Sequence, residues 1–340
     1  MKRTEGIACA RAGLLGNPSD GYFGKIIAVS VRNFRARVVL EENAEIVIVP
    51  AAEDEERYAS LDEFVRGTFL YGYYGGVRLV KAAIKKFHDY VRSSGMTLEK
   101  ANFSVRYESD IPRQIGLAGS SAIITATLRA LMDFYGLTVP LDIQPSLVLS
   151  AERDELDINA GFMDRVIQVY EGCMFMDLDE NLIRTRGHGR YERLDPALLP
   201  PLYLAYKPAL GKVSGRVLNE IRVKVDRGDA FTIGTLRKLG ELAEEGKKAL
   251  LAGDHPTFSR LMDENFELRR SIQTISPANQ EMIAAARACG ASAKYAGSGG
   301  SIIGDYRDEA QFSSLKRALE SIGAVILTPI VSSISGCSSE

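Results

Sequence analysis

The chain has 340 residues, with 42 lysines and arginines against 44 aspartates and glutamates, so its formal net charge is −2. This balance gives no long-range electrostatic reason to expect nucleic acid or an anionic membrane as a partner. A hydrophobic share of 46% and a charged share of 25% are ordinary for a soluble globular protein, and the length predicts two domains.

The cysteines and histidines argue against a metal centre. The chain has three histidines, and its four cysteines, Cys9, Cys173, Cys289 and Cys337, lie far apart without metal-ligand spacing. The first three lie among apolar or small residues, so we expect buried thiols. No leader peptide, bilayer-length apolar span or lipidation signal is found, and we therefore expect a cytoplasmic protein.

The first part of the chain has the pattern of β-strands. Residues 26–40 alternate apolar and polar side chains, and residues 45–49 are a second, shorter strand candidate. Together they suggest a β-hairpin. Residues 71–91 then predict a helix, and residues 103–107 predict a further strand.

The run IPRQIGLAGSSAIITAT, residues 111–127, joins a small-residue loop directly to an apolar helix. Its apolar residues recur at helical spacing until Gly136 ends the pattern. Gly116 and Gly119 permit close backbone approach, and the first N–H groups of the helix form an anion site suited to phosphate. No lysine precedes the serines, so this is not the G-x-x-x-x-G-K-[ST] loop. A serine-capped helix after a tight turn explains the run equally well.

The second half of the chain alternates helices and strands. Helices are predicted over 146–155 and 161–170, followed by a strand over 173–178. The polar segment 179–195, with the prolines that follow it, is the best domain junction. The later predicted helices are 213–225, 231–252, 257–271, 277–289 and 309–322, and the later strands lie at 202–206 and near Lys294 and Ala324. We assign domains to 1–190 and 191–330, with a frayed tail over 331–340.

Three motifs occur in a defined order: ARAGLLGNPSDGYFGK near the N-terminus, IPRQIGLAGSSAI in the middle, and KYAGSGGSIIG late in the chain. In this order they resemble the three motifs of the GHMP small-molecule kinases, over nearly the whole chain. Together with GFMDRVIQVYEG they are most similar to the glucuronokinases, which phosphorylate glucuronic acid at its anomeric oxygen. Galactokinases and mevalonate kinases match less well, because they usually carry an N-L-I-G-E-H motif where this chain has GLLGNP.

The resemblance implies a two-domain α+β GHMP kinase fold. The N-terminal domain would be of the ribosomal protein S5 domain 2 type and the C-terminal domain ferredoxin-like, with the active site between them. It also implies ATP as co-substrate, Mg²⁺ as cofactor and a small sugar acid as acceptor. In phosphoryl transfer the protein mainly positions the nucleophile and stabilises charge on the phosphoryl oxygens.

The resemblance assigns the catalytic and metal-binding roles. Asp164, in the segment GFMDR, resembles the aspartate that orients or deprotonates the substrate hydroxyl. Glu152 resembles the glutamate that binds Mg²⁺ with a phosphate-loop serine. An ungapped alignment gives that role to Ser120, while Ser121 is one residue away and stays open. The interval from Glu152 to Asp164 is about one residue longer than we expect, which keeps Glu155 as a further candidate.

The remaining roles concern the substrate and the phosphates. Arg11 corresponds to the basic residue that stabilises the forming alkoxide and the transferring phosphoryl group. Asn17 and Asp20 match positions that bind sugar hydroxyls. The carboxylate of a uronic acid could meet Lys25, Arg113 or Arg165. The phosphate loop comprises Gly116, Leu117, Ala118, Gly119, Ser120 and Ser121, and the third motif comprises Gly297, Ser298, Gly299 and Gly300.

Three functions therefore compete. The first is an ATP-dependent glucuronokinase that makes a sugar 1-phosphate. The second is a GHMP kinase for another sugar such as galactose, arabinose or a heptose. The third is a non-catalytic sugar or nucleotide sensor on the same fold, against which the presence of both Asp164 and Arg11 argues, because a sensor has no need of a base.

Overall fold

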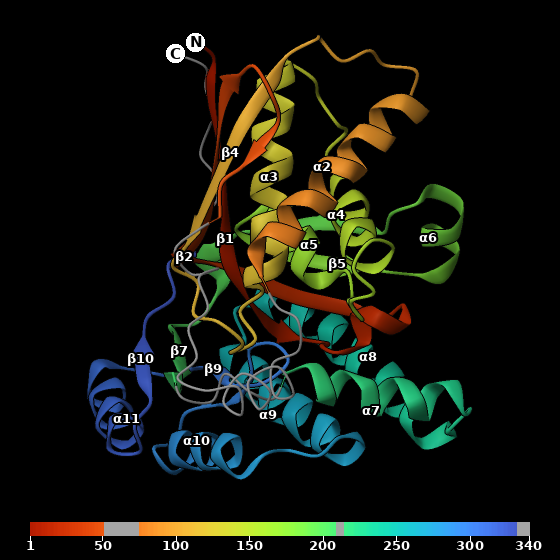
Figure 1. The fold of residues 1–340 in the computed structure, drawn as a ribbon. Coiled ribbons are helices and arrows are strands. Elements are labelled where there is room, and N and C mark those ends of the chain that lie inside the picture. The colour runs from red at the N-terminus through yellow and green to blue at the C-terminus, as the bar shows by residue number, and fades with distance from the viewer. Residues whose placement is uncertain (51–74, 209–213, 332–340) are drawn as a thin grey trace, which may run out of the picture.

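The structure is a computed structural model that describes residues 1–50, 75–208 and 214–331 (Figure 1). Its first part is a mixed sheet with helices beside it, and its second part is a smaller antiparallel sheet with its own helices. The α+β architecture predicted from the sequence is confirmed. None of the helices in the described ranges is both long enough and apolar enough to cross a lipid bilayer.

The first sheet is built around the long strand β2 (Lys25–Asn43), which pairs with three others. The strands of this sheet run in the order β3-β4-β2-β5-β6, and β1 also pairs with β2. Their bounds are β1 Arg3–Leu15, β3 Val47–Ile48, β4 Asn102–Ser109, β5 Cys173–Asp177 and β6 Arg190–Leu194. β2 is buried on both faces over residues 26–31 and alternates over 36–40, where one face meets solvent.

The predicted hairpin of residues 26–40 with residues 45–49 is wrong. Both edges of β2 are occupied near its end, because Glu41 lies opposite Arg3 of β1 and opposite Ser104 of β4. β3 can therefore join the sheet only at β4, with which it pairs in parallel. β1, which pairs antiparallel with β2, lies outside the strands that the sequence pattern predicts. It is buried continuously from residue 8, so it lacks the alternation that marks a strand with one solvent face.

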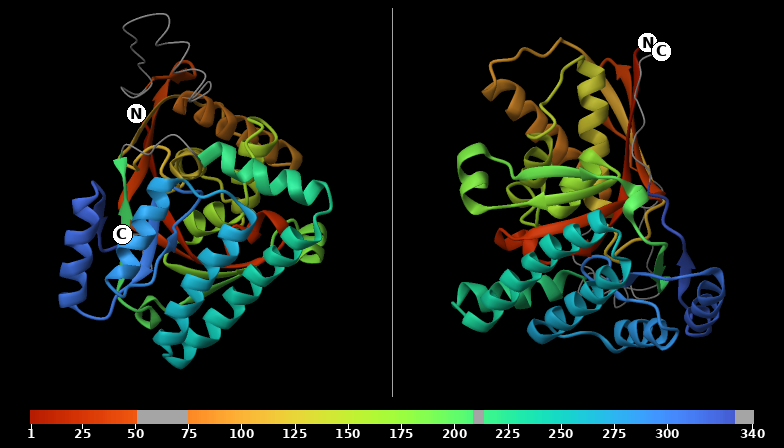
Figure 2. Two further views of the ribbon diagram at one scale, coloured as in Figure 1. Left: turned by 90° about the horizontal axis from the view of Figure 1, so that it is seen from below. Right: turned by 180° about the vertical axis from the view of Figure 1, so that it is seen from behind.

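Helices α2 to α5 gather on one side of this sheet (Figures 1 and 2). Their bounds are α2 Gly76–Ser93, α3 Gly119–Tyr135, α4 Gln144–Arg153 and α5 Met163–Tyr170. α3 packs directly on β1, where a Cβ on Gly6 would lie 1.9 Å from the carbonyl oxygen of Ala126. Four predicted helices and the strand at 103–107 are confirmed in type, although residues 71–74 lie outside the described ranges. This packing places the middle of α3 over the first half of β1, and the backbone N–H of Arg11 donates to Leu117 O just before α3 begins.

The second sheet has the strand order β10-β7-β9-β8 and is antiparallel throughout. Its strands are β7 Leu202–Tyr206, β8 Lys294–Tyr295, β9 Ser301–Asp305 and β10 Val325–Leu327. Its helices are α7 Ser214–Asp226, α8 Ala230–Ala252, α9 His255–Ile272, α10 Pro277–Ala288 and α11 Glu309–Ser321. The order along the chain and across the sheet is that of a ferredoxin-like domain, as predicted.

The segment 179–195, predicted as a polar junction, contains the helix α6 (Glu180–Arg186) and the strand β6, which pairs with β5. The chain passes from the first sheet to the second between Leu194 and Leu202. The division into 1–190 and 191–330 stays a prediction. The predicted tail falls almost entirely on residues 332–340, outside the described part of the chain.

Two of the predicted thiols are buried as expected. Burial raises the pKa of Cys9 to about 11 and that of Cys173 to about 12, so both are inert thiols at neutral pH. Cys289 is only half-buried, because it follows the end of α10, and Cys337 lies outside the described residues.

Candidate active site

A cavity of about 1080 Å³ lies between the two parts of the chain. Its walls come from segments far apart in the sequence: β1, the short 3-10 helix η1 (Ser19–Tyr22), the loop before α3, the end of α4, the start of α5, the helix α9 and the loop after β8. The cavity thus brings together the three sequence motifs. Most predicted site residues line it: Arg11, Asn17, Asp20, Gly116, Leu117, Ala118, Gly119, Ser120, Ser121, Glu152, Asp164, Gly297 and Ser298.

The loop before α3 and the loop after β8 touch each other through glycines. A Cβ on Gly297 would lie 2.1 Å from the carbonyl oxygen of Gly116, and one on Gly300 would lie 2.8 Å from the Cα of Ile115. Gly116 has a φ of 74°, which L side chains rarely adopt. The third motif therefore closes against the phosphate loop, and Gly299 and Gly300 support this contact rather than line the cavity.

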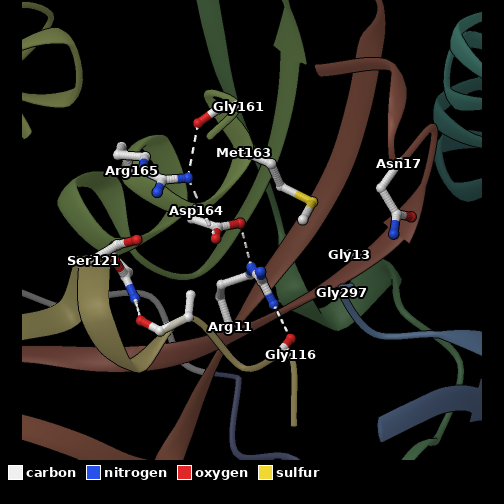
Figure 3. A network of polar contacts seen from close by, with 12 residues as sticks. Arg11, Gly13, Asn17, Gly116, Ser121, Gly161, Met163, Asp164, Arg165 and Gly297 are labelled. Carbon is white, nitrogen blue, oxygen red and sulfur yellow. Dashed lines mark hydrogen bonds and ion pairs between the residues drawn. The ribbon is translucent and has the colours of Figure 1, made fainter. Parts of the chain in front are cut away.

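A buried ion pair joins β1 to α5 (Figure 3). Arg11, whose side chain is 5% exposed, donates from Nε to Asp164 Oδ1 at 2.6 Å and from Nη1 to the carbonyl oxygen of Gly116 at 2.5 Å. Arg165 Nη1 lies 3.4 Å from the other oxygen, Asp164 Oδ2. Asp164 keeps 16% of its side chain exposed, so a molecule in the cavity can reach it.

The charges around Asp164 determine its protonation. Burial, the largest effect, opposes ionisation, but the charges of Arg11 and Arg165 and the hydrogen bond from Arg11 outweigh it. The pKa of Asp164 is therefore below its usual value, and the carboxylate is ionised at neutral pH. Asp20 behaves in the opposite way, because burial and the neighbouring charge of Asp164 raise its pKa.

Asp20 is held against the start of α5. Its Oδ2 accepts a hydrogen bond from the backbone N–H of Met163 at 3.2 Å. A Cβ on Gly161 would lie 1.9 Å from the same oxygen, so only glycine permits this approach. The sugar-motif aspartate and the catalytic-motif aspartate therefore share one end of the cavity.

Glu152 lies beside Ser121 and Arg165. Its Oε1 accepts from Ser121 Oγ at 3.0 Å, and its Oε2 accepts from both Nε and Nη2 of Arg165 in a close ion pair. The Glu152 side chain is 1% exposed. Burial raises its pKa, and the charge of Arg165 offsets this in part. Glu155 lies elsewhere, paired with Lys85 and Lys86 outside the cavity lining.

The donor set fits a magnesium ion that arrives with ATP. No group of three or more His, Cys, Asp or Glu side chains suited to a metal occurs in the described ranges. Mg²⁺ in phosphoryl-transfer sites usually takes only one or two protein oxygens and completes its shell with water and phosphate. Ser121 Oγ and Glu152 Oε1, 3.0 Å apart at the cavity wall, supply such a pair.

The three basic residues predicted for a uronate carboxylate fall in different places. Lys25 is outside the cavity lining, and its Nζ pairs with Glu244 at 2.7 Å. Arg165 is engaged by Glu152 and Asp164. Arg113 lines the cavity just before the phosphate loop.

Sequence reasoning missed three further arginines of the cavity wall, which are Arg153, Arg222 and Arg269. The sequence does contain a signal for Arg269. With Asn265 this arginine occupies a buried position on α9 among Phe258, Leu261 and Phe266, and a charged side chain on the apolar face of a helix points to a specific environment.

The family model for the GHMP kinases N terminal domain matches residues 78–172, and the model for the GHMP kinases C terminal region matches residues 247–325. Glucuronokinase 1 of Arabidopsis thaliana is 43% identical over 300 residues, which are 86% of this chain and 82% of that protein. This chain belongs to the GHMP kinases. It is accordingly an ATP-dependent phosphotransferase with an alcohol group as acceptor.

Two further GHMP kinases extend the comparison. Probable glucuronokinase 2 of Arabidopsis thaliana is 42% identical to this kinase over 301 residues, 86% of this chain and 82% of that protein. The crystal structure of Lactococcus lactis galactokinase complexed with galactose superposes with a TM-score of 0.75 at 15% identity, covering 98% of this chain and 94% of that one. The second likeness supports the fold alone.

The contact between the two loops predicts the effect of Gly297→Ala. The new Cβ would lie 2.1 Å from Gly116 O and 2.6 Å from Arg11 Nη1, so the loops must separate and Arg11 must shift. We expect turnover, measured as ADP release, to fall strongly, with a loss of roughly 1–3 kcal/mol in the free energy of unfolding. Gly21→Ala is the matched control, because Gly21 lines the same cavity and its Cβ would meet no atom within 4 Å. Unchanged turnover in Gly297→Ala would contradict the close contact.

Proposed function

We propose that this kinase transfers the γ-phosphoryl group of ATP to the anomeric hydroxyl of D-glucuronate and so produces glucuronate 1-phosphate and ADP. One observation carries the proposal: a largely buried, ionised aspartate faces the same cavity as the phosphate loop, in a chain 43% identical to Glucuronokinase 1 over 300 residues. The bond between the anomeric oxygen and the γ-phosphorus forms, and the bond to the β-γ bridging oxygen breaks.

Asp164 is the proposed catalytic base. Because Arg11 and Arg165 keep it ionised, it can accept a hydrogen bond from the anomeric hydroxyl and take its proton as the new bond forms. A carboxylate with a lowered pKa is a weak base, so we assign it mainly to orienting the hydroxyl, with proton transfer late in the reaction. Arg11 lies 2.6 Å from Asp164 and is held in place, so it can stabilise negative charge on the attacking oxygen.

The phosphates of ATP are proposed to bind at the start of α3. The first N–H groups of a helix have no intrahelical partners, and the helix dipole adds positive potential there. Bound Mg²⁺ supplies further neutralisation of the phosphoryl oxygens. Glu152 and Ser121 would hold it, since the hydrogen bond between their side chains favours Ser121 over Ser120. Asp20 is positioned to accept hydrogen bonds from the sugar hydroxyls.

Asp164→Asn tests the base. An amide can still hydrogen-bond but cannot accept the proton, so we expect kcat with glucuronate to fall by roughly 10²- to 10⁴-fold while ATP binding is kept. Asp157→Asn is the control, because Asp157 is another carboxylate of the cavity wall and its φ of 51° suits asparagine equally well. Turnover of Asp164→Asn near that of Asp157→Asn would sink the assignment.

The serine register is tested by the Mg²⁺ dependence of turnover. Glu152→Gln removes a charged oxygen, so we expect the Mg²⁺ concentration for half-maximal rate to rise by about tenfold or more, a typical result of weakening a metal's ligand shell. Ser121→Ala should have a smaller effect of the same kind. Ser120→Ala is the matched comparison, and its effect on the Mg²⁺ requirement should be smaller than that of Ser121→Ala. A larger effect in Ser120→Ala than in Ser121→Ala would mean that the ungapped alignment is right.

A further inference from the structure

Two buried donors at the cavity wall have no hydrogen-bond partner. They are Nδ2 of Asn17 and Nη2 of Arg269, which belong to side chains of residues that are 2% and 1% exposed. In the described part of the chain, no other buried side-chain atom without a partner belongs to a residue that lines this cavity. Buried donors are almost always paired in native proteins, and both of these belong to residues of one cavity wall, so an acceptor that binds at this wall would complete them.

Lys294 fixes the orientation of the Asn17 amide. Its Nζ donates to Asn17 Oδ1 at 2.6 Å, to Gly13 O at 2.6 Å and to Tyr295 O at 2.8 Å. An ammonium group has three donors and no acceptor, so Asn17 must present its carbonyl oxygen to it. With Lys294 protonated, Oδ1 is the amide atom that faces Nζ, and the amide nitrogen is the group that remains.

Arg269 is held in place by neutral groups. Its Nη1 donates to the carbonyl oxygen of Gly297 at 2.6 Å, its Nε donates to Gln273 Oε1 at 3.1 Å, and its guanidinium lies 5.0 Å from the ring centroid of Tyr295. One helical turn earlier on α9, Asn265 binds the backbone of Gly16 and Asn17. The same helix thus positions both orphan donors.

Some of the buried cations of the cavity have a carboxylate partner and others do not. Arg11 and Arg165 are matched by Asp164 and Glu152. Among the described residues, no ion pair joins a carboxylate to Arg269 or to Lys294, although both are 1% exposed. Burial lowers the pKa of Arg269 to about 10, although Tyr295 and the carboxylate of Asp20 favour its charged form, and burial together with the charges of Arg269 and Arg11 lowers the pKa of Lys294 well below its usual value. A buried cation without an ion-pair partner is costly, and an anion bound beside it relieves that cost.

We propose that Asn17 Nδ2 and Arg269 Nη2 form the subsite for the carboxylate of the sugar acid, with Lys294 as the positioning residue behind Asn17. The inference rests on the proposed function and names the groups that make the cavity select an acid over a neutral sugar. A guanidinium and an amide supply two N–H donors to the two carboxylate oxygens, and the positive charge is supplied by the protein in advance.

The subsite adjoins the catalytic pair through Gly297. Gly297, which accepts from Arg269, also packs against Arg11, and Met163 lies between Asp164 and Asn17 (Figure 3). In a hexuronic acid the anomeric carbon and the carbon that bears the carboxylate flank the ring oxygen. One sugar can therefore present its hydroxyl to Asp164 and its carboxylate to this subsite.

Asn17→Asp is the sharpest test. The new carboxylate pairs with Lys294, which preserves the buried contact, but it replaces the free donor by a negative charge that faces the substrate carboxylate. We expect kcat/KM for glucuronate to fall at least about 100-fold while that for glucose stays the same or rises, because an acceptor suits a hydroxymethyl group. Arg269→Met should also lower kcat/KM for glucuronate, chiefly by raising KM. If the two residues had a purely structural role, kcat/KM would fall equally for both sugars.

Arg222→Met is the control for the general positive charge of the cavity. Arg222 lines the same cavity but donates to Asn159 Oδ1 at 3.2 Å and lies 3.7 Å from Asp226. We expect its ratio of glucuronate to glucose kcat/KM to stay within about threefold of wild type. Binding of each sugar without ATP, measured by calorimetry, checks that the loss in Asn17→Asp and Arg269→Met lies in carboxylate recognition.

The possible results separate the two proposals. If the wild type prefers glucuronate and folded Asn17→Asp keeps that preference within about threefold, the subsite is overturned and the proposed function stands. An equal loss for both sugars, or a loss in Arg222→Met as large as in Arg269→Met, also overturns the subsite. If the wild type itself does not prefer glucuronate, both proposals fail. Should Arg269→Met not fold, Asn17→Asp alone decides.

Discussion

The ion pair between Arg11 and Asp164 is the interaction on which the rest of the site depends. Arg11 belongs to β1, which pairs with the long central strand β2 of the first sheet, and its guanidinium also binds the phosphate loop at Gly116 and packs beneath Gly297. A buried charge must be matched by its surroundings or it destabilises the fold. Strand, phosphate loop, helix α5 and the C-terminal loop are therefore positioned around one charged group, and the active site is assembled by the same contacts that close the two parts of the chain together.

The cavity then divides by charge. On the side of the phosphate loop each buried arginine has a carboxylate, so this half is pre-organised and nearly neutral before substrates bind. Around Arg269 and Lys294 the donors are held only by carbonyl and amide oxygens. The first half holds Asp164 ionised between two arginines, and the second half favours an anionic ligand. This division links the catalytic step and substrate selection to a single electrostatic layout.

Much of this could be predicted from the sequence, where the information is local. Glycine loops and the periodicity of α3 depend on neighbouring residues, and the N-terminal motif and the segment GFMDR pointed to Arg11 and Asp164. The parallel joining of β3 to β4 could not be foreseen, because it depends on which sheet edges other strands leave open. The contact of Lys294 with Asn17 joins residues 277 positions apart, and no local pattern records it. Ser120 and Ser121 differ by one position on a helix, so only the packing of α3 against α4 shows which one meets Glu152.

The most direct measurement is the pKa of the Asp164 carboxyl, followed by ¹³C NMR of labelled aspartate in the wild type and in Arg11→Met, with Asp164→Asn used to assign the signal. In the wild type the arginine charges outweigh burial, so we expect Asp164 to titrate below the usual range of an aspartate. In Arg11→Met burial is opposed by Arg165 alone, and the pKa should rise. A wild-type Asp164 that titrates above the usual range, or one whose titration is unchanged by the loss of Arg11, would contradict the claim that Arg11 holds an ionised base in place.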